Sequence, residues 1–328
     1  MRVSVEWMTR HQVPLYLAGL TLGAFVGILA PAVAHPAEMA IHPVLALLLY
    51  ATFLGIPFGR IGGAFGDWRF LGTILAVNFV VVPIVVWLLS RIVAHDQVLF
   101  VGVLFVLLTP CIDYVIVFAG LAGGDEERLL AAAPLLMLAQ MLLLPLYLWL
   151  FVGAEFITTV EFAPFIEAFV LIIALPLVAA GLTQLAAART EAGRTWEQIA
   201  TGAMVPLMVA TLAVVVTSQI DGVRAQLGPL LLVVPLYILF AAVMVPIGAV
   251  AGRIGGLDPA GRRAVVFSGA TRNSLVILPL VLALPAAFDL APLVVVTQTL
   301  VELVVMVVFV CLIPKIIANP AASAVARQ

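Results

Sequence analysis

The sequence predicts an all-α integral membrane protein of ten transmembrane helices, arranged as two inverted five-helix repeats in which the fourth and ninth helices are discontinuous. Three observations lead to this prediction: the composition, the lengths of the apolar runs, and polar and proline residues that recur at one interval. Of the 328 residues, 65% are hydrophobic and only 10% are charged, and the mean hydropathy is +1.26. A water-soluble domain carries far less apolar sequence, so we expect the chain to lie in a lipid bilayer.

The counts of charged, cysteine and histidine residues exclude several other classes of protein. There are 15 Lys and Arg against 17 Asp and Glu, so the net charge is −2 and no basic surface for nucleic acid is expected. Cys111 and Cys311 both fall in apolar segments and cannot form a disulfide framework. The 4 histidines are scattered without metal-ligand spacing. We therefore expect neither a metal site nor a bound cofactor.

Ten apolar runs are long enough to cross the hydrocarbon core of a membrane. A helix needs roughly 20 apolar residues to do so, and its backbone polar groups must be paired internally. The runs cover residues 13–30, 41–58, 70–90, 97–122, 129–153, 165–185, 199–219, 229–250, 264–284 and 291–313. The connections between them are short, so the function must reside in the membrane.

Basic residues are distributed unequally between the two sides of these runs. Of the 15 Lys and Arg, all but Arg91, Arg224 and the intramembrane Arg272 lie at the termini or in every second connection. The positive-inside rule then places both termini in the cytoplasm. Alternatively, the first run could be a signal peptide cleaved near residues 32–34, although it is longer than the about 7–15 apolar residues typical of one.

Polar and proline residues recur at one interval along the chain. Pro110 and Arg272 are 162 positions apart, and so are Gln140 and Glu302. Ten helices divide into five and five, and an odd number of helices in each repeat makes the two repeats inverted. We expect the first repeat within residues 1–153 and the second, with a cytoplasmic tail, within residues 165–328.

Three ionisable residues lie near the middle of predicted spans: Asp113, Arg272 and Glu302. Ionisable groups at this depth are costly unless paired or hydrated, and alternating-access transporters bind their substrates there. Gln298 lies one helical turn before Glu302, on the same face. Asp113 and Arg272 could also form a purely structural ion pair. Gln140 and Asn78 are interpreted as hydrogen-bonding groups between helices.

The fourth span contains a sequence that should interrupt its helix. Thr109, Pro110 and Cys111 precede Asp113, and the proline removes a backbone hydrogen bond and clashes with the preceding turn. Thr109 and Cys111 are therefore candidates to contact a solute at the break. Cys111 could instead be an inert packing residue, as buried cysteines often are.

The ninth span carries a polar run at the corresponding place in the second half. It contains Gly269, Arg272, Asn273 and Ser274, and we expect the glycine to permit an unwound turn. Backbone groups at the ends of the two half-helices would then be presented to a solute, together with the side chains of Arg272, Asn273 and Ser274.

These stretches resemble a known family. The residues from Pro110 to Val117 and from Leu121 to Asp125, the run 267–274 and the run 297–302 are similar to arsenical-resistance permeases, a branch of the bile acid:sodium symporter superfamily. The resemblance implies that helices four and nine cross at the membrane midplane, and that a core bundle moves against a panel bundle. It also implies export of arsenite or antimonite in exchange for protons.

Residue by residue, the resemblance is incomplete in the ninth span. Cys111 falls on the cysteine of the family's fourth helix, but Arg272 stands at the first of two family asparagines, Asn273 at the second, and Leu275 at a family glutamate. Asp113 or Glu302 would then have to carry the coupling proton.

The sequence therefore supports two transport hypotheses. The first is a proton-coupled exporter of arsenite or antimonite. The second is a sodium-coupled importer of a small organic anion, with Arg272 binding a carboxylate and Thr109, Gln298 and Glu302 near the cation. An intramembrane enzyme is disfavoured, because no Ser/His or paired-Asp protease signature occurs in adjacent spans. A channel is disfavoured, because broken helices with charged residues near the midplane suit a carrier better than a pore. The expected partners are the lipid bilayer and the solute. The excess of Arg over Lys favours a bacterial cytoplasmic membrane, while the oligomeric state is open.

Overall fold

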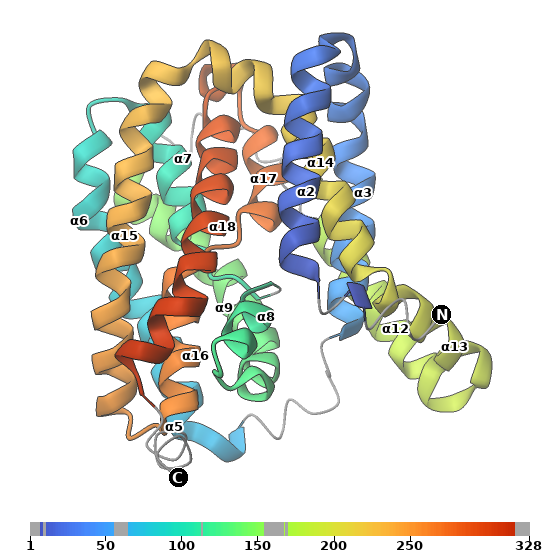
Figure 1. The fold of residues 1–328 in the computed structure, drawn as a ribbon, viewed down its shortest axis with the longest axis vertical. Helices are drawn as coiled ribbons and strands as arrows, with labels where there is room; N and C mark the ends of the chain where they lie inside the picture. The colour runs from blue at the N-terminus through green and yellow to red at the C-terminus, as the bar shows by residue number, and fades with distance from the viewer. Residues whose placement is uncertain are drawn as a thin grey trace. The chain divides into compact units, whose positions relative to one another are not determined.

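The structure is a computed structural model that describes residues 7–8, 11–55, 65–112, 114–153, 167 and 170–318. Within these ranges the chain is helical (Figure 1), and the one β-type pairing is an isolated antiparallel bridge between Pro110 and Arg272. The predicted all-helical class is thereby confirmed for the described residues.

Six helical segments of the described chain are long and apolar enough to cross a bilayer. They are Pro31–Gly55, Trp68–Val93, Glu126–Val152, Met204–Ala225, Leu227–Ile254 and Ala286–Ile316. Large apolar side chains on them face outward, for example Leu142, which is 77% exposed. Such exposure on several long helices fits a lipid environment. The protein is accordingly a multi-pass membrane protein, and the count of ten spans stays a prediction.

The chain forms two compact units, each assembled from separate stretches of sequence. Unit 1 comprises Met1–Ile56, Glu161–Leu230 and Leu278–Val296, and unit 2 comprises Pro57–Val160, Leu231–Ile277 and Thr297–Gln328. Each unit therefore combines residues from both halves of the chain. This division follows contacts and not sequence repeats, so the repeats expected within residues 1–153 and 165–328 stay a prediction.

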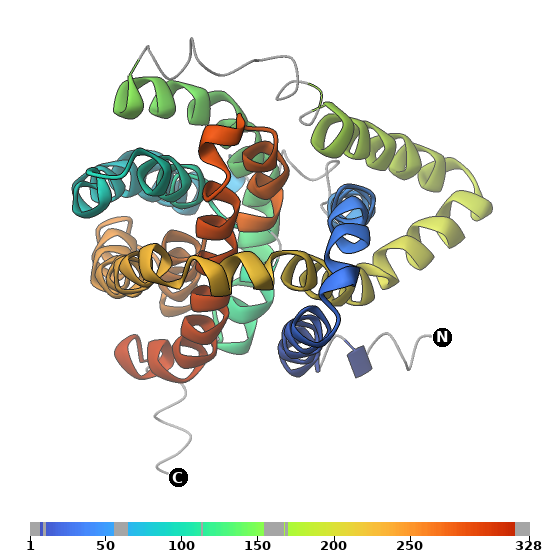
Figure 2. The ribbon, with the colours of Figure 1, turned by 90° about the horizontal axis from the view of Figure 1, so that it is seen from above.

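Unit 1 is built around the packing of α14 against two helices from the start of the chain. Its helices are α2 (Gln12–Leu29), α3 (Ala34–Gly55), α12 (Leu175–Arg189), α13 (Glu191–Gly202) and α14 (Met204–Ala225). Figures 1 and 2 show α2 and α3, in blue, beside α14, in yellow, and α12 also packs on α3.

A row of glycines allows α2 and α14 to approach closely. Gly19, Gly23 and Gly27 recur every four residues on the face of α2 that meets α14. A Cβ atom on Gly23 would lie 2.5 Å from the carbonyl oxygen of Ala213. The contact is also hydrogen bonded, because Thr217 Oγ1 donates to the Gly23 carbonyl over 3.0 Å. The absence of side chains at these glycines therefore lets the backbones of α2 and α14 pack directly against each other.

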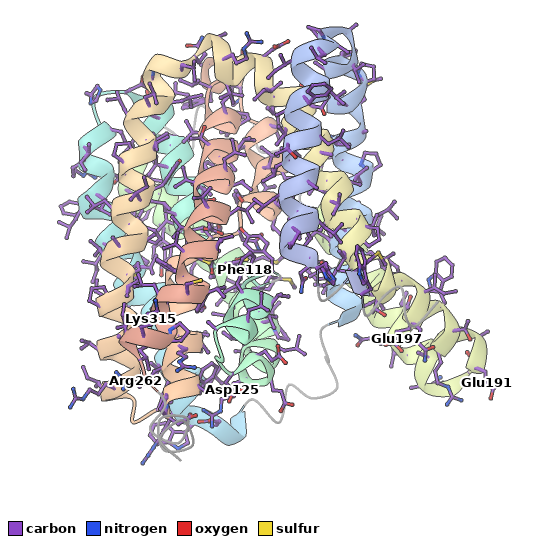
Figure 3. All side chains as sticks on the ribbon, viewed as in Figure 1. Phe118, Asp125, Glu191, Glu197, Arg262 and Lys315 are labelled. Atoms are coloured by element: carbon purple, nitrogen blue, oxygen red, sulfur yellow. The ribbon has the colours of Figure 1, made fainter. Side chains whose placement is uncertain are left out.

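The seventh predicted span begins later than expected. Residues 191–202 form a separate helix, α13, and α14 starts at Met204. Thr190 initiates α13 by accepting a hydrogen bond from the Gly193 N–H over 3.0 Å. Charged residues such as Glu191 and Glu197, labelled in Figure 3, make this segment too polar to continue the span. The second helix also begins earlier than predicted, at Ala34.

Unit 2 holds the remaining long helices. They are α5 (Trp68–Ala76), the π-helical turn η4 (Val77–Val81), α6 (Val82–Ser90), α7 (Gln97–Leu107), α8 (Tyr114–Leu121), α9 (Glu126–Val152), α15 (Leu227–Ile254) and α16 (Pro259–Ala270). After α16 the chain continues into α17 (Ser274–Leu282), and α18 (Ala291–Ile316) ends the described helices.

Charged residues form ion pairs and hydrogen bonds between helix ends at one end of unit 2. Figure 3 labels Asp125, Arg262 and Lys315 there. The Arg128 side chain lies 3.0 Å from an oxygen of Asp67 and 3.2 Å from one of Asp125. Arg263, which is 9% exposed, donates to the carbonyl of Ile317 after α18 and to that of Ala122 after α8. Arginines thereby join the ends of helices that are distant in sequence.

Candidate functional site

Two helices of unit 2 are broken where the sequence predicted. One break separates the end of α7 at Leu107 from the start of α8 at Tyr114, and the other separates the end of α16 at Ala270 from the start of α17 at Ser274. The interruptions predicted within residues 97–122 and 264–284 are therefore present, while their numbering as the fourth and ninth spans stays a prediction.

The two breaks lie side by side and pair as a short antiparallel bridge. The Cys111 N–H donates to the Thr271 carbonyl over 3.3 Å, and the Asn273 N–H donates to the Thr109 carbonyl over 2.8 Å. These bonds satisfy backbone groups that the helices cannot pair, which a water-poor interior requires. We call residues 108–112 and 271–273 the crossing.

Gly269 does not provide the unwound turn that we expected. It remains inside α16, and it is not among the described glycines with positive φ. A Cβ atom there would lie 3.0 Å from Val77 Cγ1 and 3.1 Å from Met244 Cε, so the position serves close packing. The chain unwinds two residues later, where Thr271 adopts an extended conformation with φ −98° and ψ 142°.

Glu302 on α18 is bonded to the crossing and is only 4% exposed. Its Oε2 accepts the backbone N–H of Arg272 over 2.7 Å and a second hydrogen bond from Gln298 Nε2. Its Oε1 accepts the hydroxyl of Tyr114, and that hydroxyl also lies 3.2 Å from the Arg272 carbonyl. Glu302 thus accepts the Arg272 N–H directly, and the Tyr114 hydroxyl that it also accepts lies beside the Arg272 carbonyl.

The guanidinium of Arg272 is completely buried and is bonded to protein acceptors. Its Nη2 lies 2.6 Å from the Ser268 carbonyl, 2.8 Å from the Gly269 carbonyl and 2.9 Å from Asn78 Oδ1, and its Nη1 lies 3.4 Å from the Leu107 carbonyl. Its central carbon is 5.5 Å from the centre of the Phe240 ring. No carboxylate of the described residues lies within ion-pair distance of it. Both Nη atoms of Arg272 therefore donate to the protein itself, while its buried Nε has no hydrogen-bond partner.

The other predicted contact residues are also buried at the crossing. Thr109 Oγ1 donates to carbonyls of the preceding turn, and Ser274 Oγ accepts from Thr299 Oγ1 over 2.7 Å. Asn273 Oδ1 accepts the Val276 N–H, but its buried Nδ2 has no hydrogen-bond partner. Cys111 is 0% exposed, so no bulk solvent reaches its thiol in this conformation. Asp113 lies outside the described residues.

A small pocket adjoins Glu302 and has room for about one water molecule. Besides Gln298 and Glu302, it is lined by Tyr237 and Phe240 of α15 and by the terminal residues of α7 and α16. Gln298 Oε1 is buried without a hydrogen-bond partner. Apart from Tyr237, Gln298 and Glu302 the lining is apolar, and it includes Ala241, Val301 and Val305.

A comparison with protein families matches residues 42–226 to the sodium bile acid symporter family. The chain belongs to this family. The match includes Thr109, Cys111 and Tyr114 but ends before the second break and Glu302. No curated protein matches the chain. Members of the family are secondary transporters and not enzymes, so this symporter-family protein moves a small solute across a membrane.

Sequence reasoning missed two residues of the site. Tyr114 directly follows Asp113 and begins α8, which places its hydroxyl on Glu302. Asn78 was assigned only to helix contacts, and it does donate to Ser268 Oγ over 2.9 Å, but it also accepts from Arg272. Asn78 lies in the π-helical turn η4, and such turns often occur at functional sites, but this turn is visible only in the structure.

Proposed function

We propose that this family member is a proton-coupled exporter of arsenite or antimonite that works by alternating access. Family membership supports secondary transport. The likeness of the fourth helix to arsenical-resistance permeases, with Cys111 at the family's cysteine, supports the solute. The excess of Arg over Lys supports a bacterial cytoplasmic membrane, and the distribution of basic residues supports the placement of both termini in the cytoplasm.

The observation that carries proton coupling is the attachment of Glu302 to the crossing. An ionised carboxylate accepts the hydrogen bonds of Tyr114, Gln298 and the Arg272 N–H simultaneously. A protonated carboxyl loses part of this acceptor capacity and becomes a donor. Protonation of Glu302 would therefore weaken the hold on the unwound backbone of α16–α17 and bias the crossing toward a second arrangement.

The groups around Glu302 suit such a switch. Arg272 supplies a nearby positive charge, Tyr114 donates its hydroxyl to the carboxylate, and Tyr237 lines the adjoining pocket. A proton entering from outside would be exchanged for solute leaving the cell. Asp113 stays a second candidate for this role.

The solute side of the proposal relies on neutral polar groups. Arsenite near neutral pH is a small uncharged trihydroxide, and trivalent arsenic binds thiols. Thr109, Asn273 and Ser274 offer hydroxyl and amide groups, the Nδ2 of Asn273 has an unused donor, and Cys111 offers one thiol. One thiol would bind arsenic transiently, as a carrier requires. Because all four residues are buried, the solute could reach them only after a conformational change.

The sodium-coupled organic-anion alternative gains less support from the same geometry. It needs a guanidinium free to bind a carboxylate, whereas both Nη atoms of Arg272 donate to backbone carbonyls or to Asn78, which leaves its Nε as the one donor without a partner.

The proposal is tested by arsenite accumulation in bacteria that lack their own exporters. Wild-type protein should lower accumulation relative to empty vector, and Glu302→Gln and Cys111→Ala should abolish or strongly reduce that effect at equal membrane levels. Cys311→Ala is the matched control, since Cys311 is an exposed cysteine on α18, and it should export normally. Wild-type accumulation equal to that of the vector would refute arsenite export, while full activity of Glu302→Gln would refute coupling through this carboxylate.

A further inference from the structure

The crossing brings together two helix ends that attract cations. The last carbonyls of a helix lack partners within it and carry negative partial charge. In unit 2 the half-helix α7 ends at Leu107 and the half-helix α16 ends at Ala270, and both residues line the same small pocket. Carbonyls of broken helices at such places can coordinate a coupling cation.

A cation is already present at the carbonyls of these two helix ends, and it is the side chain of Arg272. The Arg272 guanidinium donates to the carbonyls of Ser268 and Gly269 in the last turn of α16, and to the carbonyl of Leu107 at the end of α7. Asn78 Oδ1 supplies a fourth oxygen, and the Phe240 ring covers one face of the group.

We infer that Arg272 is a tethered cation that permanently fills the cation position formed by the ends of α7 and α16, so that neither transport nor stability requires sodium. A guanidinium keeps its charge throughout the physiological pH range. Because it is covalently attached, it cannot be carried across the membrane and released. The position therefore neutralises the helix ends without coupling transport to an ion gradient.

This inference goes beyond the proposed function, because it concerns the resident cation and not the exported solute. The groups that face the guanidinium are Asn78, Phe240 and the carbonyls named above, and its own backbone N–H contacts Glu302. Of the described residues, Glu302, Cys111 and Tyr114 are the ionisable groups close enough to interact electrostatically with Arg272.

The experiment measures the melting temperature of the purified protein in detergent, in sodium chloride and in choline chloride of equal ionic strength. Wild-type protein should melt at the same temperature in both salts. Arg272→Ala should melt lower in choline chloride and should recover several degrees in sodium chloride or guanidinium chloride at low concentration, because a ligand that binds only the folded state stabilises it. Arg272→Lys, which keeps a tethered charge, should remain insensitive to sodium.

Two results would overturn the inference: a sodium-dependent rise in the melting temperature of wild-type protein, or an Arg272→Ala variant that responds to neither cation. If Arg272→Ala does not accumulate in the membrane, Arg272→Gln replaces it under the same criteria. If neither Arg272→Ala nor Arg272→Gln accumulates in the membrane while Arg272→Lys does, the result supports the need for a positive charge at the ends of α7 and α16. None of these measurements uses arsenite, so they are independent of the test of export.

Discussion

The close contact between α2 and α14 permits a quantitative prediction about a single methyl group. Gly23→Ala would place a Cβ atom 2.5 Å from the Ala213 carbonyl oxygen and 2.9 Å from its Cα, and both of these are backbone atoms that cannot rotate away. The two helices must then separate, which also stretches the 3.0 Å hydrogen bond from Thr217 to the Gly23 carbonyl. Overpacking of this kind costs about 1–3 kcal/mol.

A matched control for this change lies in the same unit. Gly181 in α12 is also a helical glycine, but a Cβ atom there would meet nothing within 4 Å. Gly181→Ala should therefore be neutral or stabilising, by up to about 1 kcal/mol, because alanine favours the helix. The two substitutions add the same atom and should move stability in opposite directions.

The assay is thermal unfolding of each purified variant in one detergent. About 1 kcal/mol corresponds to roughly 2–4 °C for a domain of 150–250 residues. Gly23→Ala should therefore melt several degrees below wild type, and Gly181→Ala at or above it. Equal or higher stability of Gly23→Ala would show that the helices do not approach as closely as described, and the packing argument would be wrong.

Two further predictions concern unit 2. Tyr114→Phe should lower export several-fold and change its pH profile, because it removes only the hydroxyl that joins the carboxylate on α18 to the crossing; Phe118→Leu, one turn further along α8, should leave the pH profile unchanged. Arg263→Ala should lower the melting temperature by several degrees, because it removes a buried charged donor that bonds to two helix ends. Each hydrogen bond to a charged group contributes about 1.5–3 kcal/mol to the free energy of unfolding. Arg253→Ala, which removes an exposed arginine from α15, should have little effect, and an equal loss in both arginine variants would contradict this explanation.

Local chemistry in the sequence was sufficient to predict the helix breaks. Pro110 cannot donate to the helix, and the polar run from Thr271 to Ser274 interrupts an otherwise apolar span. The expectation for Gly269 was wrong because a glycine can equally serve close packing, and only its neighbours Val77 and Met244 distinguish the two uses. The extra helix α13 was missed because a search for apolar runs does not detect a polar helix.

The sequence by itself predicted a helical membrane protein with two interrupted helices and with three ionisable residues near the middle of apolar spans, Asp113, Arg272 and Glu302. Hydrophobicity and backbone chemistry act locally, so the composition and spacing of residues are enough to predict the apolar helices and their interruptions. Which groups meet was decided only by the tertiary structure. The carbonyls around Arg272 come from residues up to 165 positions away, and Tyr114 meets Glu302 across 188 positions. Hydrogen bonds form within about 3 Å, and no pattern along one chain specifies distances of that kind between helices that lie far apart in sequence.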